Sequence, residues 1–162
     1  MLIRPALPAE LDTVGRLTVE AYTADGHLSG SDGYATELRD AASRAELATL
    51  LVAVDEAAPQ PLGTVTFALA GTAYAEISAP GEAEFRMLAV APAAQGRGVG
   101  AGLVQACVDR AEATGSTALA LCSMATMTPA HRIYERFGFV RAPDRDWEPE
   151  PCIRLVAYLL PL

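Results

Sequence analysis

Residues 84–100 read EFRMLAVAPAAQGRGVG, a stretch that joins an apolar run, a short proline-containing loop and three glycines at alternate positions. The run that ends at Val90 is mostly apolar and predicts a strand. Apolar residues recur at helical spacing from Val99 and Leu103 onward, and Gly115 ends the pattern, which predicts a helix. The glycines therefore stand between the end of a strand and the start of a helix.

The loop Gln95–Gly100 has the features of a phosphate site. Glycine tolerates positive φ and, having no side chain, lets a bulky anion approach the main chain. The unpaired N–H groups at a helix start point outward, and the helix dipole favours negative charge there. Arg97 adds a guanidinium suited to phosphate. The sequence therefore predicts that main-chain amides at this helix start hold a diphosphate.

Other phosphate-binding loops fit the sequence less well. Gly96-x-Gly98-x-x-Ala101 satisfies a loose dinucleotide fingerprint. That motif needs an acidic residue about 20 positions on, whereas residues 116–123 contain no carboxylate. A P-loop needs lysine, and the chain contains none. A nucleotide-dependent oxidoreductase is therefore the weakest hypothesis, and a tight turn that binds nothing is the structural alternative.

Composition limits the class of protein. The 162 residues fit one domain, residues 1–162. A net charge of −8 argues against nucleic acid and anionic membranes as partners. No stretch approaches the ~20 consecutive apolar residues of a membrane helix, and the first residues lack a signal-peptide pattern, so a cytoplasmic location is expected. The 3 widely spaced cysteines and 2 histidines predict neither a disulfide framework nor a metal site.

Strand and helix patterns follow one another irregularly along the chain. Short apolar runs predict strands at residues 2–4, 49–54, 62–69, 82–90, 117–122 and 152–159, with a weaker signal after Gly138. Helical periodicity predicts helices near residues 11–21, 32–45, 99–115 and 128–137. Residues 142–151 are expected to form an exposed loop. The order β-α-α-β-β-β-α-β-α-β-β indicates a mixed α/β or α+β domain.

Two motifs resemble those of a known family. Leu88-Ala89-Val90-x-Pro92 followed by Gln95-x-x-Gly98-x-Gly100 resembles the acyl-CoA-binding signature of the GNAT family, the Gcn5-related N-acetyltransferases. Residues 130–139, AHRIYERFGF, are similar to the family element A-x-x-x-Y-E-x-x-G-F. The opening residues 3–12 and the order of elements are also similar, so the resemblance covers most of the chain.

The resemblance implies a GNAT-like acyl-CoA N-acyltransferase fold: a central, mostly antiparallel sheet of six to seven strands, splayed after the fourth strand, with about four helices. Acetyl-CoA or another acyl-CoA would lie between strands 82–90 and 117–122, with its pantetheine arm paired to the first of these. The residues implied to bind it are Leu88, Ala89, Val90, Gln95, Gly96, Arg97, Gly98, Val99, Gly100, Ala101, Thr128 and Tyr134. Many members carry Asn where this chain has Met127; Thr126 or Thr128 replaces that contact, or the contact is absent.

The resemblance also implies a reaction, the direct transfer of an acyl group, usually acetyl, to an amine. The amine must be neutral to attack, and a free alkyl amine has a pKa of ~10.4, so a base or a water relay helps. The thioester oxygen becomes negative and needs a donor, expected from a main-chain N–H near residues 88–90. The departing thiolate benefits from a proton, although a thiol pKa of ~8.5 makes this demand the mildest.

Tyr134 and Glu84 are the implied catalytic residues. Tyr134 matches the family tyrosine that protonates the departing sulfur; the alternative is a helix aromatic packed against the sheet. Glu84 matches a position at which some members carry a glutamate base, which would also face the substrate. Strand alternation places Glu84 on the same face as Arg86, Leu88 and Val90. The alternative for Glu84 is an ordinary charge near a strand start.

In this family the acceptor enters opposite the coenzyme, between the first two helices, their loop and the last hairpin. That loop is rich in glycine, and Tyr22, Asp25, Asp32 and Tyr34 suit a cationic amine by charge and by cation–π contact. A solvated, turn-forming loop is the alternative. Trp147 is interpreted either as an aromatic wall of the site or as a loop anchor.

Several alternatives stay open at this point. A catalytically silent acyl-CoA sensor or interaction module on the same fold is the second function hypothesis. A covalent route through Cys122 ranks below direct transfer, because buried structural cysteine is the more common case. The acceptor is a small-molecule or peptide amine that the sequence does not name, and the resemblance leaves a homodimer open.

Overall fold

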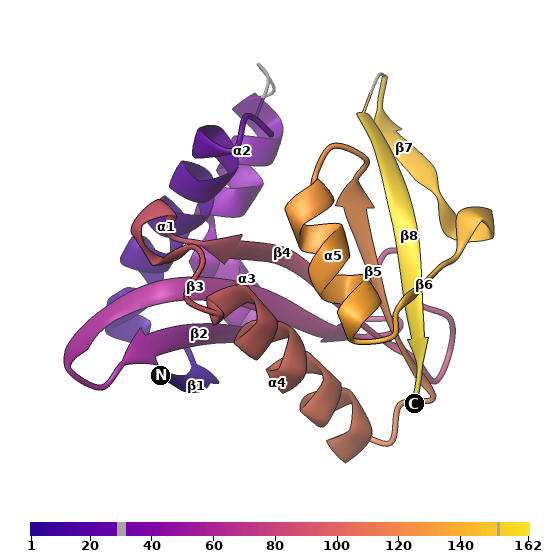
Figure 1. Ribbon diagram of the computed structural model, residues 1–162, viewed down its shortest axis with the longest axis horizontal. Helices are drawn as coiled ribbons and strands as arrows, with labels where there is room; N and C mark the ends of the chain where they lie inside the picture. The colour runs from indigo at the N-terminus through magenta and orange to yellow at the C-terminus, as the bar shows by residue number, and fades with distance from the viewer. Residues whose placement is uncertain (29–31, 152) are drawn as a thin grey trace.

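The computed structural model describes residues 1–28, 32–151 and 153–162 (Figure 1). Within them one sheet runs in the order β1-β2-β3-β4-β5-β8-β6, and β7 pairs with β8. Neighbouring strands are antiparallel, except for the parallel pair β4 and β5. The strands are β1 (Leu2–Pro5), β2 (Thr49–Asp55), β3 (Ala58–Leu69), β4 (Ala83–Val90), β5 (Ala118–Met124), β6 (Val140–Arg141), β7 (Trp147–Glu150) and β8 (Ile153–Pro161).

Helices cover both faces of the sheet, with α4 and α5 on one face and α1 to α3 on the other (Figure 1). The helices are α1 (Leu11–Ala24), α2 (Asp32–Arg39), α3 (Ala41–Leu47), α4 (Val99–Ala113) and α5 (Thr128–Arg136). An apolar cluster fills each side: Leu103 of α4 packs with Leu119 of β5 on one, and Leu17 and Leu38 pack with Ala89 on the other. No helix in the described ranges is long and apolar enough to cross a bilayer.

The predicted fold class is confirmed, but two details of the predicted order are wrong. The helix expected over 32–45 is divided into α2 and α3, because the side chain of Asp40 accepts a hydrogen bond from Ser43 N at 3.0 Å and caps a new helix. The loop expected over 142–151 contains β7, which forms a hairpin with β8. The part of the chain that the structure describes therefore has 8 strands, one more than the predicted order contains. It also has one α-helix more than expected.

A few predicted features cannot be compared with the structure. Ser29, Gly30 and Ser31 of the expected acceptor loop lie outside the described residues, as does Cys152 at the start of the last expected strand. The side chain of Asp32 is also outside the description.

A β-bulge reverses the direction of side chains part-way along β4. Arg86 pairs with Thr66 and Ala89 with Thr64, so two residues of β4 stand opposite one residue of β3. Met87, within the bulge, has a positive φ of 55°. Such a bulge adds one residue to a strand and shifts its alternation. The expected face shared by Glu84, Arg86, Leu88 and Val90 is therefore wrong beyond Arg86.

The two faces of β4 show this reversal in their packing. Phe85, before the bulge, packs in the cluster beside α4 and α5, and Leu88 and Val90 pack against the same cluster. Met87 and Ala89 belong to the cluster beside α1 and α2. The side chains of β4 thus alternate between the two sides of the sheet before and after the bulge, and the bulge shifts this alternation by one residue.

The sheet opens between β4 and β5, as the resemblance implies. The two strands pair only from Ala83 with Leu119 to Phe85 with Leu121. β5 continues beside β8 to the pair of Met124 with Leu155, while β4 diverges from it (Figure 1). Among the described residues, β4 beyond Phe85 is paired with β3 alone, so its other edge offers unpaired main-chain groups.

Candidate functional site

The glycine loop stands at the start of α4, where the sequence places it. Gly96 and Gly98 have φ values of 75° and 80°, and a Cβ at either position would meet no atom within 4 Å. Their role is thus to set the backbone conformation and leave space in front of the helix. The first turn of a helix leaves its N–H groups without intrahelical partners, and here that turn begins at Val99.

The glycine loop contacts α5, Asp55 and Asp25. Gly100 is buried, and a Cβ there would lie 3.3 Å from Ile133 Cδ1 of α5, so α5 borders the helix start. Arg97 is exposed and pairs with Asp55 at 3.3 Å. Gln95 Nε2 lies 3.4 Å from Asp25 Oδ1. Asp25, predicted to face the acceptor, therefore contacts the predicted coenzyme loop instead.

Tyr134 of α5 is 4 % exposed and lies in an aromatic cluster below the opening of the sheet. Its ring centroid is 5.9 Å from Phe85, 6.0 Å from Phe139 and 5.8 Å from Tyr158. The packing role considered for this residue is therefore present. Burial raises the pKa of the Tyr134 phenol, so the phenol is protonated at neutral pH, as an exposed tyrosine is, but is a weaker acid than one.

The start of α5 differs slightly from the expectation. Thr128 is the first residue of the helix rather than its cap, and Met127 takes the cap position without a side-chain hydrogen bond. The Met127 side chain packs against the cluster beside α1 and α2. It also lines the cavity described next, so it faces away from the aromatic cluster of Tyr134.

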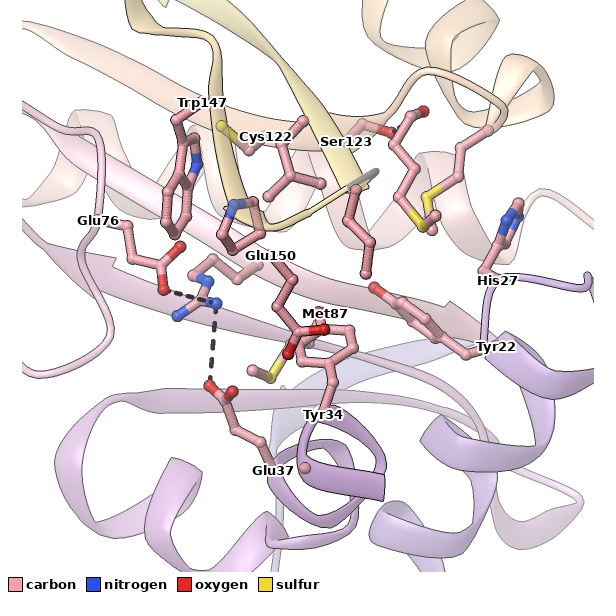
Figure 2. A pocket seen from close by; sticks show the side chains of 17 residues that line it. Tyr22, His27, Tyr34, Glu37, Glu76, Met87, Cys122, Ser123, Trp147 and Glu150 are labelled. Atoms are coloured by element: carbon pink, nitrogen blue, oxygen red, sulfur yellow. Dashed lines mark hydrogen bonds and ion pairs between the residues drawn. The ribbon is translucent and has the colours of Figure 1, made fainter. Parts of the chain in front are cut away.

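A cavity of about 250 Å³ lies on the α1–α2 side of β4. Its walls come from α1, α2, β4, β5 and the β7–β8 hairpin, which are far apart in the sequence (Figure 2). The aromatic rings of the lining belong to Tyr22, His27, Tyr34 and Trp147. Tyr22 and Tyr34 were predicted to be near the acceptor, and Trp147, interpreted as an aromatic wall or as a loop anchor, lies in the wall of the cavity. The charged residues of the lining are Glu37, Glu76, Arg86 and Glu150.

Arg86 lines this cavity and forms ion pairs with two glutamates, which the dashed lines of Figure 2 mark. Its Nη2 lies 2.9 Å from Glu76 Oε1 and 3.8 Å from Glu37 Oε1, and its side chain is 14 % exposed. Burial raises the pKa of Glu76; Arg86 opposes this, and the negative charges of Glu84 and Glu37 add to it. Glu76 is thus a carboxylate with more than ordinary affinity for a proton, on the wall of a cavity.

Glu84 occupies a different position from Glu76 and does not line the cavity. It is 1 % exposed, and its Oε2 accepts hydrogen bonds from the main-chain N–H groups of Glu76, Ile77 and Ser78 at 2.9, 3.0 and 3.1 Å. The hydroxyl of Ser78 donates to the same oxygen at 3.1 Å. Among the described residues, Glu84 Oε1 has no hydrogen-bond partner. Glu84 therefore fixes the turn that carries Glu76.

Sequence reasoning missed the charged part of the cavity. Glu37, Glu76 and Glu150 lie on three separate segments, and no local motif links them. Arg86 could have indicated that carboxylates lie nearby, because a charged side chain within an otherwise buried strand needs a partner of opposite charge.

Cys122 and Ser123 of β5 also line the cavity. Burial raises the pKa of the Cys122 thiol to about 12, so the thiol is protonated at neutral pH and is a poor nucleophile. The imidazole of His131 on α5 lies with Nε2 3.1 Å from Ser123 Oγ and 3.1 Å from Met124 O.

The geometry agrees with a comparison against protein families. The model described as the acetyltransferase (GNAT) family matches residues 15–139. The chain belongs to the GNAT family. A comparison with curated proteins found no match. The matched range contains the glycine loop, both strands that border the opening of the sheet, and α5.

Solved GNAT structures share the fold of this GNAT protein. A GNAT family acetyltransferase from Brucella melitensis in complex with acetyl-CoA is 22 % identical, with a TM-score of 0.66, over 99 % of this chain and 87 % of that one. A GCN5-related N-acetyltransferase from Kribbella flavida is 24 % identical, with a TM-score of 0.73, over 99 % and 97 %. A ribosomal-protein-alanine N-acetyltransferase from Brucella melitensis is 19 % identical, with a TM-score of 0.70, over 100 % of both chains.

Proposed function

We propose that this GNAT protein is an acyl-CoA-dependent N-acyltransferase, a single domain over residues 1–162 that uses acetyl-CoA as donor. The observation that supports this function most directly is the arrangement of the loop and the cavity around β4. Its unpaired edge leads to the glycine loop, while Arg86 and Met87 of the same strand line the cavity, together with Cys122 of β5. We infer that the donor lies along this edge and the acceptor in the cavity, so that the two molecules meet at β4. The acetyl-CoA complex of a structural neighbour supports the choice of donor.

The donor would be held mainly by main-chain groups. The N–H groups from Gly96 to Gly100 would take the pyrophosphate, because the helix start favours negative charge. The N–H of Gln95, also expected to bind it, donates instead to Pro92 O at 3.3 Å. The edge of Leu88–Val90 would pair with the pantetheine arm, and an N–H there would stabilise the oxyanion. Thr128 and Tyr134 of α5 would border the arm from the other side.

The reaction converts R–NH₃⁺ and acyl-S-CoA into R–NH–acyl, CoA-SH and one proton. We assign proton removal from the ammonium group to Glu76, which faces the cavity, and we assign to Glu84 the positioning of Glu76. The neutral amine then attacks the thioester carbon, and the C–S bond breaks. Tyr134 gives its phenolic proton to the departing sulfur, and the second proton, lost by the attacking nitrogen as the amide forms, restores the phenol.

The decisive experiment is a thiol-release assay with acetyl-CoA across a panel of amines, together with a calorimetric titration of coenzyme A. Turnover with at least one amine supports the proposal. Coenzyme binding without turnover of any amine would instead indicate a binding module. Absence of coenzyme binding would exclude both the enzyme and the binding module.

Gly98→Asp should weaken coenzyme A binding by about 10-fold or more, because it combines strain at a positive φ with a negative charge at the diphosphate site. Gly71→Asp is the matched control: Gly71 has a φ of 81° and, like Gly98, open space around its missing Cβ. Calorimetry should show unchanged affinity in the control. Equal affinities in the two variants would place the diphosphate elsewhere.

Tyr134→Phe should lower kcat by about 10-fold, below the usual range for general acids, because a thiolate is a good leaving group. Phe keeps the ring contacts of the aromatic cluster, so coenzyme affinity should stay nearly the same. Tyr158→Phe, in the same cluster, is the control and should keep wild-type kcat. An unchanged kcat for Tyr134→Phe would remove Tyr134 from the mechanism.

A further inference from the structure

The cavity offers little to an acceptor that carries a carboxylate. Among its described lining residues, the carboxylates of Glu37, Glu76 and Glu150 accompany the single guanidinium of Arg86. Figure 2 shows Glu37 and Glu76 on either side of that guanidinium, with Glu150 approaching from the hairpin. A ligand that enters this space meets an excess of negative charge.

Arg86 is the group that would ordinarily bind the carboxylate of an amino acid. Here it already bridges Glu76 at 2.9 Å and Glu37 at 3.8 Å, and little of its side chain is exposed. A third carboxylate would have to displace one of these partners or lie beside them without compensation. Like charges placed together in this way oppose binding strongly.

The rest of the lining suits the body of a small cationic amine. Tyr22, Tyr34 and Trp147 present aromatic rings, and rings of this kind attract a cation through their faces. Met87 and Leu155 add apolar surface. A cavity of about 250 Å³ is smaller than the ~300–1,000 Å³ typical of drug-sized ligands.

We propose that the acceptor is a small cationic amine without a carboxylate, and that the Glu37–Arg86–Glu76 bridge is the determinant that excludes amino acids. This inference rests on the proposed N-acyltransferase function for its biological meaning. Selection between an amine and the corresponding amino acid is nevertheless a property of binding, and it is measurable without turnover.

The test uses matched pairs that differ only by a carboxylate: tyramine with tyrosine, histamine with histidine, and agmatine with arginine. Each is titrated calorimetrically into the full chain saturated with coenzyme A, and kcat/KM with acetyl-CoA is measured separately. We expect at least one pair to bind, and in every pair that binds the amine should be preferred by about 10-fold or more. Preference for the amino acids, equal affinity, or binding of no member of any pair would overturn the proposal.

Two variants test the bridge itself. Glu37→Gln removes one carboxylate and frees one side of Arg86, so the preference for the amine should fall by several-fold. Glu148→Gln makes the same charge change on β7 at an exposed residue outside the cavity lining, and should leave the preference unchanged. An equal effect of both variants would assign the selection to overall charge rather than to the bridge. Selective binding of amines without turnover would support this inference while removing the proposed catalytic function.

Discussion

Glu76→Gln should lower kcat by about 10²-fold or more, the usual contribution of a positioned general base. Glutamine keeps the size of the side chain and a hydrogen bond to Arg86, but it does not accept a proton. Coenzyme A affinity should be unchanged, because Glu76 lies on the wall of the acceptor cavity. Steady-state kinetics with the best amine of the panel, together with a coenzyme titration, measure both quantities.

The pH dependence gives the same prediction a sharper readout. Burial raises the pKa of Glu76, and the base acts as a carboxylate, so wild-type kcat should rise with pH in a range above that of an ordinary glutamate. In Glu76→Gln this rise should vanish, and the rate should follow the supply of neutral amine up to a pH of about 10.4 for an alkyl amine. Glu148→Gln should keep the wild-type profile. A wild-type profile in Glu76→Gln would return the role of base to Glu84 or to a water relay.

Glu84→Leu should lower the free energy of unfolding by about 3 kcal/mol or more. The substitution removes the acceptor of three main-chain N–H groups and one hydroxyl, and each buried donor left without a partner costs roughly 1–3 kcal/mol. Urea unfolding followed by circular dichroism measures the change. Glu84→Gln keeps one carbonyl oxygen that accepts hydrogen bonds, so it should recover part of the loss.

The same variants distinguish a positioning role from a purely structural one. If Glu84 positions Glu76, then Glu84→Gln should shift the pH profile of kcat while the folded fraction stays high at low temperature. Full stability in Glu84→Leu would contradict the hydrogen-bonding account of the 76–78 turn. Reduced stability with an unaltered pH profile in Glu84→Gln would leave Glu84 a structural role alone.

Features that depend on local chemistry could be predicted from the sequence. The glycines at 96 and 98 adopt positive φ before a helix that begins at Val99, because no other residue type takes that backbone so readily. The opening between β4 and β5 followed from the family resemblance carried by the glycine loop and the Tyr134 motif. Tyr22 and Tyr34, which the resemblance placed on the acceptor side, line the cavity, and their role toward an acceptor stays a prediction.

Features that depend on distant contacts could not be predicted in this way. Asp25 contacts Gln95, 70 residues away, and nothing in its own segment indicates that partner. The bulge at Met87 adds a single residue to β4 and inverts the expected faces beyond it, although period-two reasoning holds up to Arg86. The charged lining of the cavity comes from α2, the 76–78 turn and β7, which only the complete sheet brings together.

The bulge of β4 has a practical implication for altering this protein. Arg86 and Met87 line the cavity, while Leu88 and Val90 pack on the other side of the sheet, so under the proposed function adjacent positions of one strand would serve two different molecules. Substitutions at the first two positions should retune which amine is accepted and leave thioester binding largely intact. Deleting one residue at the bulge should instead exchange the two sets of side chains and disable both compartments together.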